Sequence, residues 1–130
     1  MTTDLTYLAY TAMLTAALWI PYIASQVMTN GFLKAGDYAD PTPRPVPAWG
    51  KRADRTHINA VESFAPFAAL ILIAEVAHKA DGMTAFWAQW FFWARAAHAV
   101  VYLLGVPYLR TLIFTVGFVA VVGEFWRLIH

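Results

Sequence analysis

Four long apolar stretches take up most of this 130-residue chain and leave little sequence for anything else. They run over about residues 5–28, 54–78, 84–104 and 108–128. A helix of about 20 apolar residues crosses the hydrocarbon core of a bilayer, and each stretch reaches that length. Only 13% of the residues are charged, whereas soluble domains carry about 25%. The sequence therefore predicts one all-α domain, residues 1–130, folded as a four-helix transmembrane bundle.

The net charge and the missing cysteines exclude several classes of function. A net charge of +1 gives no indication of a nucleic-acid partner. Because the chain has no cysteine, it has no disulfide, no thiolate metal site and no cysteine nucleophile, and we expect no metal centre. Any thiol chemistry must therefore use a thiol that a ligand brings. The N-terminus lacks the basic region of a signal peptide, so the first stretch is expected to remain a membrane helix.

The longest predicted connection, about residues 29–51, separates the first two helices. We expect its four prolines, Pro41, Pro43, Pro45 and Pro47, to hold it extended. Basic residues gather on its side of the membrane: Lys34, Arg44, Lys51, Arg52, Arg55 and, after the third helix, Arg110. The positive-inside rule then makes this loop cytoplasmic. We expect an integral protein of a membrane such as the bacterial inner membrane, with Pro21 kinking the first helix.

A polar stripe opens the second predicted helix. Arg52, Arg55, Asn59 and Glu62 are spaced 3, 4 and 3 residues apart. At roughly 100° per residue they fall within an arc of about 80° on one face. A charged side chain within a membrane helix is costly and faces a protein interior or a water-filled cavity. The stripe therefore predicts a functional surface at the cytoplasmic end of this helix.

The third predicted helix repeats the pattern with Arg95, His98 and Tyr102, which share an arc of roughly 60°. Arg110 opens the fourth helix at the same side of the membrane. Three helices thus bring polar groups to one depth and predict a shared pocket. Arginine binds carboxylates in a bidentate manner, and Glu62 can receive an ammonium group. A small peptide with several carboxylates fits this donor set, and a nearby arginine favours the thiolate form of a thiol.

Structural roles are the alternatives for each residue taken alone. Arg52 and Lys51 can be snorkelling residues, and Arg55 with Glu62 can be an ion pair along one helix face. His98, Tyr102 and Asn59 can serve as a packing histidine, an interfacial aromatic residue and an interhelical hydrogen-bond partner. The functional interpretation rests on the coincidence of face and depth across helices. The sequence leaves these alternatives open.

Two motifs resemble those of the MAPEG family, the membrane-associated proteins in eicosanoid and glutathione metabolism, and the resemblance is to its microsomal glutathione transferase-like members. The first is Arg52-Ala-Asp-Arg-Thr-His-Ile-Asn-Ala-Val-Glu62, and the second runs from Arg95-Ala-Ala-His-Ala-Val-Val-Tyr102 through the turn to Arg110-Thr111. The resemblance implies a homotrimer that binds glutathione as co-substrate between neighbouring subunits, near the cytoplasmic side.

The resemblance also implies roles for single residues. Arg55, Asn59 and Glu62 would hold the glutathione backbone, and His98 and Tyr102 would add contacts. Arg52 would join the binding set, and Arg95 would either bind the ligand or tie helices together. Arg110 would stabilise the thiolate, with the Thr111 hydroxyl near the sulfur. The proline-rich loop departs from the motifs of some relatives, and only Asp37 and Asp40 are candidates for a loop carboxylate that partners Arg110.

Two functional hypotheses follow. The first is a glutathione-dependent membrane transferase or peroxidase that delivers the thiolate to a lipophilic electrophile or hydroperoxide. The alternative is a non-catalytic lipid-binding or scaffold subunit of a larger membrane complex, docking through the aromatic residues at 86–93 of the third helix. A small transporter has less support, because the chain shows no internal repeat and no pair of broken helices.

Overall fold

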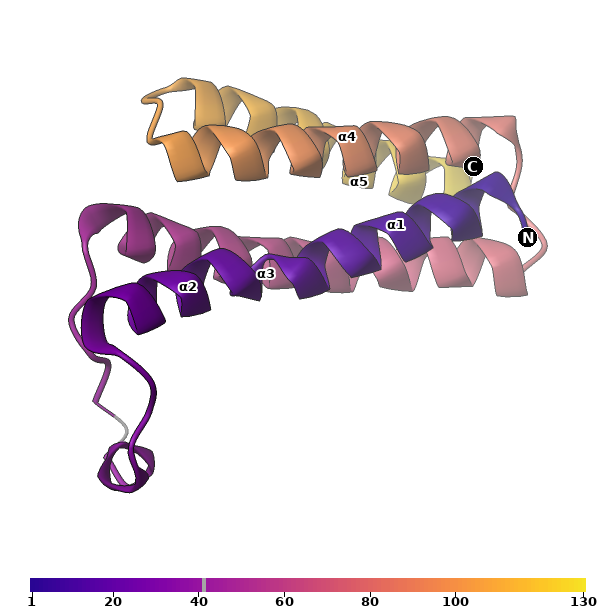
Figure 1. The fold of residues 1–130 in the computed structure, drawn as a ribbon. Coiled ribbons are helices and arrows are strands. Elements are labelled where there is room, and N and C mark those ends of the chain that lie inside the picture. The colour runs from indigo at the N-terminus through magenta and orange to yellow at the C-terminus, as the bar shows by residue number, and fades with distance from the viewer. Residues whose placement is uncertain (41) are drawn as a thin grey trace.

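The chain folds as a bundle of helices in the computed structural model, which describes residues 1–40 and 42–130; no strand occurs among them. The elements are α1 (Thr3–Ala17), α2 (Trp19–Asn30), the short 3-10 helix η1 (Ala35–Tyr38), α3 (Ala48–Val76), α4 (Gly82–Leu104) and α5 (Leu109–Ile129). Helices α1 and α2 form one broken rod alongside the other three (Figure 1). The prediction of an all-α bundle is confirmed.

Three helical segments are long and apolar enough to cross a membrane. They are Thr3–Asn30, which combines α1 and α2, Ala48–Val76 and Leu109–Ile129. The fourth predicted span, 84–104, forms a helix of 23 residues, but α4 is not among these three. Helix α4 is long enough to cross a bilayer. Its polar residues Gln89, Arg95 and His98 lower its mean hydropathy.

The first predicted helix is interrupted at Leu18, between α1 and α2. Proline has no backbone N–H, and its ring clashes with the carbonyl four residues earlier. For Pro21 that carbonyl belongs to Ala17, the last residue of α1. The position of the proline therefore explains the interruption that the sequence predicted as a kink.

Helix α3 begins at Ala48, six residues before the predicted start at 54. The apolar run marks where lipid contact begins, whereas the helix itself starts directly after Pro47, whose backbone is extended. The connection is therefore shorter than predicted, and η1 interrupts it. The prediction of an extended conformation at Pro41 lies outside the described residues.

The two ends of the bundle differ in the connections that they carry. Both termini lie at one end, together with the turn between α3 and α4 (Figure 1). The other end carries the long connection before α3 and the short turn around Gly105, which adopts a left-handed conformation with φ of 73° (Figure 1). Residues of the polar stripes near the start of α3, the end of α4 and the start of α5 therefore lie toward the same end.

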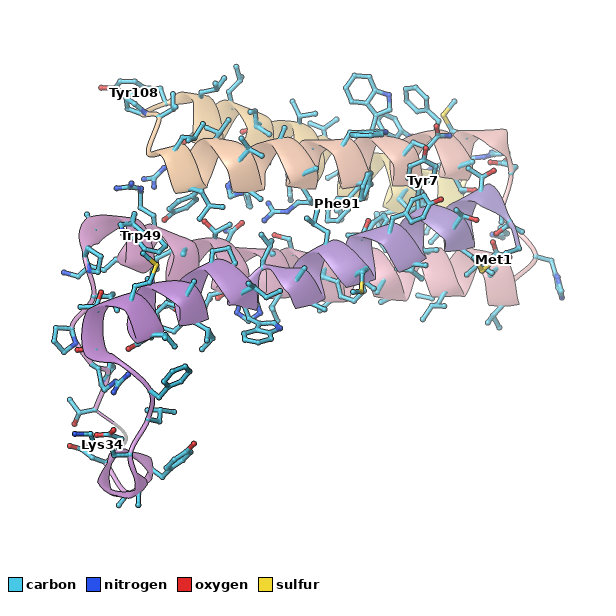
Figure 2. All side chains as sticks on the ribbon, viewed as in Figure 1. Met1, Tyr7, Lys34, Trp49, Phe91 and Tyr108 are labelled. Atoms are coloured by element: carbon cyan, nitrogen blue, oxygen red, sulfur yellow. The ribbon has the colours of Figure 1, made fainter. Side chains whose placement is uncertain are left out.

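Two small apolar clusters hold the helices together. In the first, the Phe67 ring on α3 stacks on the Phe91 ring on α4 with centroids 4.0 Å apart, next to Ile71, Ala88 and Ala120. Figure 2 shows the Phe91 side chain directed from α4 into the space between the helices. The second cluster joins Leu18, Ala60 and Ala99. Many large apolar side chains remain on the outer surface, which suits contact with lipid.

Gly123 permits the close approach of α5 to α4. A Cβ atom at this position would overlap the Trp87 ring on α4. We expect Gly123→Ala to destabilise the protein by about 1–3 kcal/mol, because the large indole must move. Gly117→Ala is the matched control on α5, since its Cβ would lie 3.7 Å from the Cβ of Ala94, in ordinary contact. Thermal unfolding followed by circular dichroism in detergent measures both; equal midpoints for the two variants would contradict the account.

Asp81 caps α4 and ties it to α5. Its side chain accepts from the backbone N–H groups of Met83 and Thr84, each at 3.0 Å, and Nε of Arg127 donates to it at 2.7 Å. The Arg127 bond is the main cause that holds the pKa of the carboxyl below its ordinary value. Stabilisation by Asp81 is therefore fully present above the unfolded-state pKa of ~3.9, and it is lost as the pH falls through the lowered folded-state pKa.

This linkage gives a pH-dependent prediction for Asp81→Asn. Asparagine retains the capping bonds but removes the charge that pairs with Arg127. We expect the variant to have a lower unfolding temperature than the wild type at neutral pH, and the difference to shrink as the pH is lowered below about 4. A difference that stays constant with pH would exclude the ionised pair as its cause.

Candidate functional site

Seven of the nine predicted site residues line two separate cavities rather than one pocket, and Arg55 and His98 line neither. The central cavity, of about 300 Å³, lies among α3, α4 and α5; the end cavity, of about 520 Å³, lies at the turn between α4 and α5. Asn59, Glu62 and Arg95 line the central cavity. Arg52, Tyr102, Arg110 and Thr111 line the end cavity. His98 lies between the two sets in sequence and contacts Tyr102.

Arg95 is the most buried of the predicted arginines, with 4% of its surface exposed. One terminal nitrogen of its guanidinium donates to the amide oxygen of Asn59 at 2.7 Å, which joins α4 to α3. Its Nε has no hydrogen-bond partner among residues 1–40 and 42–130, and no carboxylate there forms an ion pair with it. A buried guanidinium with free donor capacity is costly unless an anion reaches it.

Arg110 presents its charge at the end cavity. Its guanidinium lies over the Tyr102 ring, 4.6 Å from the centroid, which places a residue at the start of α5 against the last turns of α4. Such cation–π contacts stabilise an arginine without using its hydrogen-bond donors. Arg110 itself is exposed, so its donors are accessible to a ligand in the cavity. Thr111, the next residue, lines the same cavity.

His98 is buried next to Tyr102, the residue on which Arg110 rests. Its ring meets the Tyr102 ring edge-on with centroids 5.6 Å apart, and the Phe114 ring of α5 lies 6.1 Å away. Its Nδ1 has no hydrogen-bond partner within the described chain. His98 therefore supports the aromatic face on which Arg110 rests, and it is placed to position Tyr102.

Arg52 reaches across from α3 to the end of α4. Its Nε donates to the Leu103 carbonyl at 3.2 Å. Gly105 leaves the space for this contact, since a Cβ there would lie 3.1 Å from the same nitrogen. Arg52 is thus drawn toward the turn instead of snorkelling freely, and its guanidinium forms one wall of the end cavity.

Arg55 and Glu62 point outward from the single subunit, and both are exposed. The two do not form an ion pair in the part of the chain that the structure describes, so the interpretation as a structural pair gains no support. Glu62 borders the central cavity, whereas Arg55 lines neither cavity. Charged residues on the outer face of a membrane helix are costly unless protein or water covers them.

The candidate loop carboxylates for Arg110 are engaged elsewhere. Asp37 pairs with Arg44 at 3.5 Å. Asp40 accepts from the Thr42 N–H at 2.9 Å, and bonds from Thr42 hold the pKa of this carboxyl below its ordinary value. Neither contacts Arg110 among the described residues, so nothing supports the proposed partnership within one subunit.

Several apolar residues of the central cavity were not singled out from the sequence. The cavity is completed by Ser63, Pro66, Phe91, Phe114, Gly117, Phe118 and Val121. The last four continue the helix face that starts at Arg110, at spacings of 4, 3, 1 and 3 residues. This helical periodicity was available in the sequence, and it connects the polar end of α5 to an apolar lining deeper in the bundle.

Two buried carboxyl groups lie in the other half of the bundle. Glu124 on α5 is fully buried, and Asp4 on α1 is 3% exposed. Both carboxyl oxygens of Glu124 and Oδ2 of Asp4 lack hydrogen-bond partners among residues 1–40 and 42–130. Neither lines the two cavities of the candidate site. Neither residue is among those that the sequence predicted for the site.

Comparison with protein families matches residues 8–130, nearly the whole chain, to the MAPEG family. The chain belongs to the MAPEG family. Together with the three apolar spans, this makes it an integral membrane protein of a family in glutathione and eicosanoid metabolism. Comparisons with curated proteins and with solved structures gave no match.

Membership in the MAPEG family indicates which ligand chemistry to compare with the residues at the cavities. Members of this family generally use glutathione, a peptide with two carboxylates, one amine and one thiol. The predicted polar residues on α3, α4 and α5 match that chemistry in kind: guanidinium groups for carboxylates, a carboxylate for the amine, and neutral donors between them. The family match covers the segments that contain all of these residues.

Proposed function

We propose that this MAPEG protein is a glutathione-dependent membrane transferase or peroxidase. The observation that carries the proposal is the accessible guanidinium of Arg110, held over Tyr102 at the edge of a 520 Å³ cavity that Thr111 also lines. A cavity of that size is in the usual range for small-molecule sites. The cavity lies at the bundle end that carries the turn between α4 and α5 (Figure 1).

The binding step would use the remaining polar groups. Arg52 and Arg110 at the end cavity, with Arg55 on the outer face of α3, would bind the glutathione carboxylates. Glu62 would receive the amine. Arg95, whose Nε is free within the described chain, and its partner Asn59 would hold the peptide groups, with His98 and Tyr102 as further contacts.

The outward positions of Arg55 and Glu62 support a site shared between subunits. A ligand that contacts Arg55 and also Arg110 must extend beyond the two cavities of one subunit. We therefore propose a homotrimer in which α3 of one subunit meets α4 and α5 of its neighbour. We further propose that α4 is the fourth span, shielded by its neighbours, and that the long connection faces the cytoplasm of a bacterial inner membrane.

The chemical step needs the thiolate of glutathione. Arg110 would stabilise the negative sulfur and so lower the thiol pKa, and the Thr111 hydroxyl would donate a hydrogen bond to it. Lowering a thiol pKa by about two units corresponds to about 2.7 kcal/mol, which one arginine in a partly desolvated site can supply. The thiolate would then form a C–S bond to a lipophilic electrophile and displace its leaving group. Alternatively, it would attack a hydroperoxide, so that the O–O bond breaks, the alcohol leaves, and a second glutathione reduces the resulting sulfenic acid to the disulfide. Either substrate would enter from the bilayer between subunits.

Glu62→Gln tests the binding step. The change keeps the shape of the side chain and removes its charge, so the amine of glutathione loses its ionic partner. We expect the dissociation constant for glutathione to rise by about tenfold, since a charge-assisted hydrogen bond contributes about 1.5–3 kcal/mol. Isothermal titration calorimetry on the purified protein measures it.

Glu75→Gln is the matched control for this measurement. Glu75 lies on the same helix, but at the opposite end of the bundle, where Thr2 donates a hydrogen bond to it. Its replacement should leave glutathione affinity unchanged. Equal affinities for Glu62→Gln and the wild type would reject the role of Glu62.

A second candidate function rests on the aromatic surface of α4. Phe86, Trp90 and Trp93 are exposed, and with Gln89 they line a groove of about 410 Å³. A scaffold or lipid-binding subunit of a larger membrane complex would dock through this groove. Purification together with a fixed partner, combined with no binding of glutathione, would favour this function over the first.

A further inference from the structure

The segment 31–40, between α2 and α3, exposes large apolar side chains outside the bundle. Phe32 is 82% exposed, Tyr38 75% and Leu33 52%. Met28, in the last turns of α2, adds a side chain that is 77% exposed. Exposed apolar residues gathered in one short segment indicate a surface that meets something other than water.

The segment has a defined shape because its polar groups bond to one another. A terminal nitrogen of Arg44 donates to the Gly31 carbonyl at 3.1 Å, and the same side chain pairs with Asp37. The Asp37 carboxylate also accepts from the Lys34 backbone N–H at 2.8 Å and so closes the start of η1. These hydrogen bonds and the ion pair involve charged and backbone groups only, so the aromatic side chains stay exposed.

The segment lies beside α2 instead of continuing beyond its end. Figure 1 shows η1 level with the ends of α2 and α3 along the bundle axis and displaced to one side, and Figure 2 labels Lys34 there. A groove of about 280 Å³ separates it from α2; its walls include Tyr22, Ile23, Gln26 and Val27 on the helix and Leu33, Asp37 and Arg44 on the segment. Ile23 precedes the end of α2 by seven residues, or roughly 10 Å, so the groove lies against the last two turns of the helix.

We propose that residues 31–40 are an interfacial anchor, lying flat in the headgroup layer of a phospholipid bilayer with Phe32, Leu33 and Tyr38 in contact with the acyl chains. The depth of this segment in the membrane follows from its attachment to the ends of α2 and α3, which belong to two of the three membrane-spanning segments. A segment that runs sideways from the helix ends lies parallel to the membrane plane. Aromatic side chains are favoured at this level. The proposal is independent of glutathione binding.

The lipid that this anchor fits is zwitterionic. The segment and Arg44, which binds to it, have no net charge. The positive charges of Lys34 and Arg44 balance the negative charges of Asp37 and Asp40. Insertion therefore depends on apolar contact, with side chains reaching roughly 5–10 Å into the boundary between headgroups and acyl chains. A second copy of the chain is the competing occupant. Lipid is favoured because the wall of the groove on α2 is the side of a membrane span and includes the exposed Ile23.

The absence of cysteine from the chain makes a single-label experiment direct. Phe32→Cys and Tyr38→Cys, each labelled with a small environment-sensitive fluorophore, are reconstituted as full-length protein in phosphatidylcholine nanodiscs. We expect blue-shifted emission, quenching by a lipid with a nitroxide on its acyl chain, and iodide quenching severalfold weaker than for the free dye adduct. Iodide quenching equal to that of the free adduct would place the segment in water. Protection from both quenchers would place it against protein, and either result overturns the proposal.

Backbone hydrogen exchange is measured on protein without a fluorophore, so it tests whether the segment inserts without help from the dye. In nanodiscs, we expect the backbone of residues 31–40 to exchange severalfold faster in Phe32→Ser/Tyr38→Ser than in the wild type, with exchange in the core of α3 unchanged. Equal exchange of the segment in both proteins contradicts the anchor. Replacing a third of the phosphatidylcholine with phosphatidylglycerol should leave the nitroxide quenching unchanged, and a requirement for the anionic lipid would overturn the charge argument.

Discussion

Arg110→Ala is expected to reduce the glutathione-transfer rate at neutral pH by roughly 25-fold, because raising the thiol pKa from about 6.5 to about 8.5 lowers the thiolate fraction from about three quarters to about 3%. Glutathione should still bind through the residues on α3 and α4. The fold should persist, because Arg110 is exposed and its principal contact is the face of the Tyr102 ring. A standard conjugation assay with a lipophilic electrophile measures the rate, and size-exclusion chromatography compares the assembly.

The pH dependence of this variant separates thiol activation from a structural effect. Without Arg110 the bound thiol should ionise near its ordinary pKa of about 8.5, so the rate should rise about tenfold per pH unit up to that value. The wild-type rate should already be near its plateau at neutral pH. Arg110→Lys, which retains a charge but not the planar fork, should fall between the two. A variant whose rate is low and independent of pH would show that Arg110 acts on the structure and not on the thiol.

Arg95→Met is expected to make the protein more stable and less able to bind glutathione. Arg95 is buried and has a single neutral partner, Asn59, at 2.7 Å. Replacing buried charged groups with apolar residues of similar volume is often stabilising by about 1–4 kcal/mol. The loss of the bond to Asn59 offsets part of this gain, and we expect the unfolding temperature to rise by a few degrees.

Ligand-induced stabilisation provides the second measurement on this variant. Saturating glutathione should raise the unfolding temperature of the wild type, because a ligand that binds only the folded state stabilises it. The same addition should have little effect on Arg95→Met. A lower unfolding temperature for the variant in the absence of ligand would instead assign Arg95 the role of a tie between α3 and α4.

The sequence predicted the helical architecture well, because the apolar stretches and their turns are local features. The start of α3 was placed six residues late, since hydropathy reports lipid contact, whereas the helix begins where Pro47 allows it. The single polar pocket was also not found as predicted. Helical spacing shows which residues share a face, but it does not show that the bond from Arg95 to Asn59 and the contact of Arg110 with Tyr102 lie on different cavities.

The outward direction of Arg55 and Glu62 was likewise beyond the sequence. The polar stripe of α3 is about 80° wide, so its residues were expected to face one interior. In the folded subunit, Arg52 and Asn59 turn toward α4, whereas Arg55 and Glu62 remain exposed. Which side of such a stripe meets its own subunit depends on the packing of all the helices, which no single helix encodes.

The ultraviolet difference absorbance of glutathione bound to the purified protein tests the central claim most directly. At neutral pH the wild type should produce a saturable thiolate band, S-methylglutathione should bind without producing it, and Arg110→Ala should bind glutathione while losing the band. Saturable binding of glutathione to the wild type with no thiolate band, or an unchanged band in Arg110→Ala, would contradict the account.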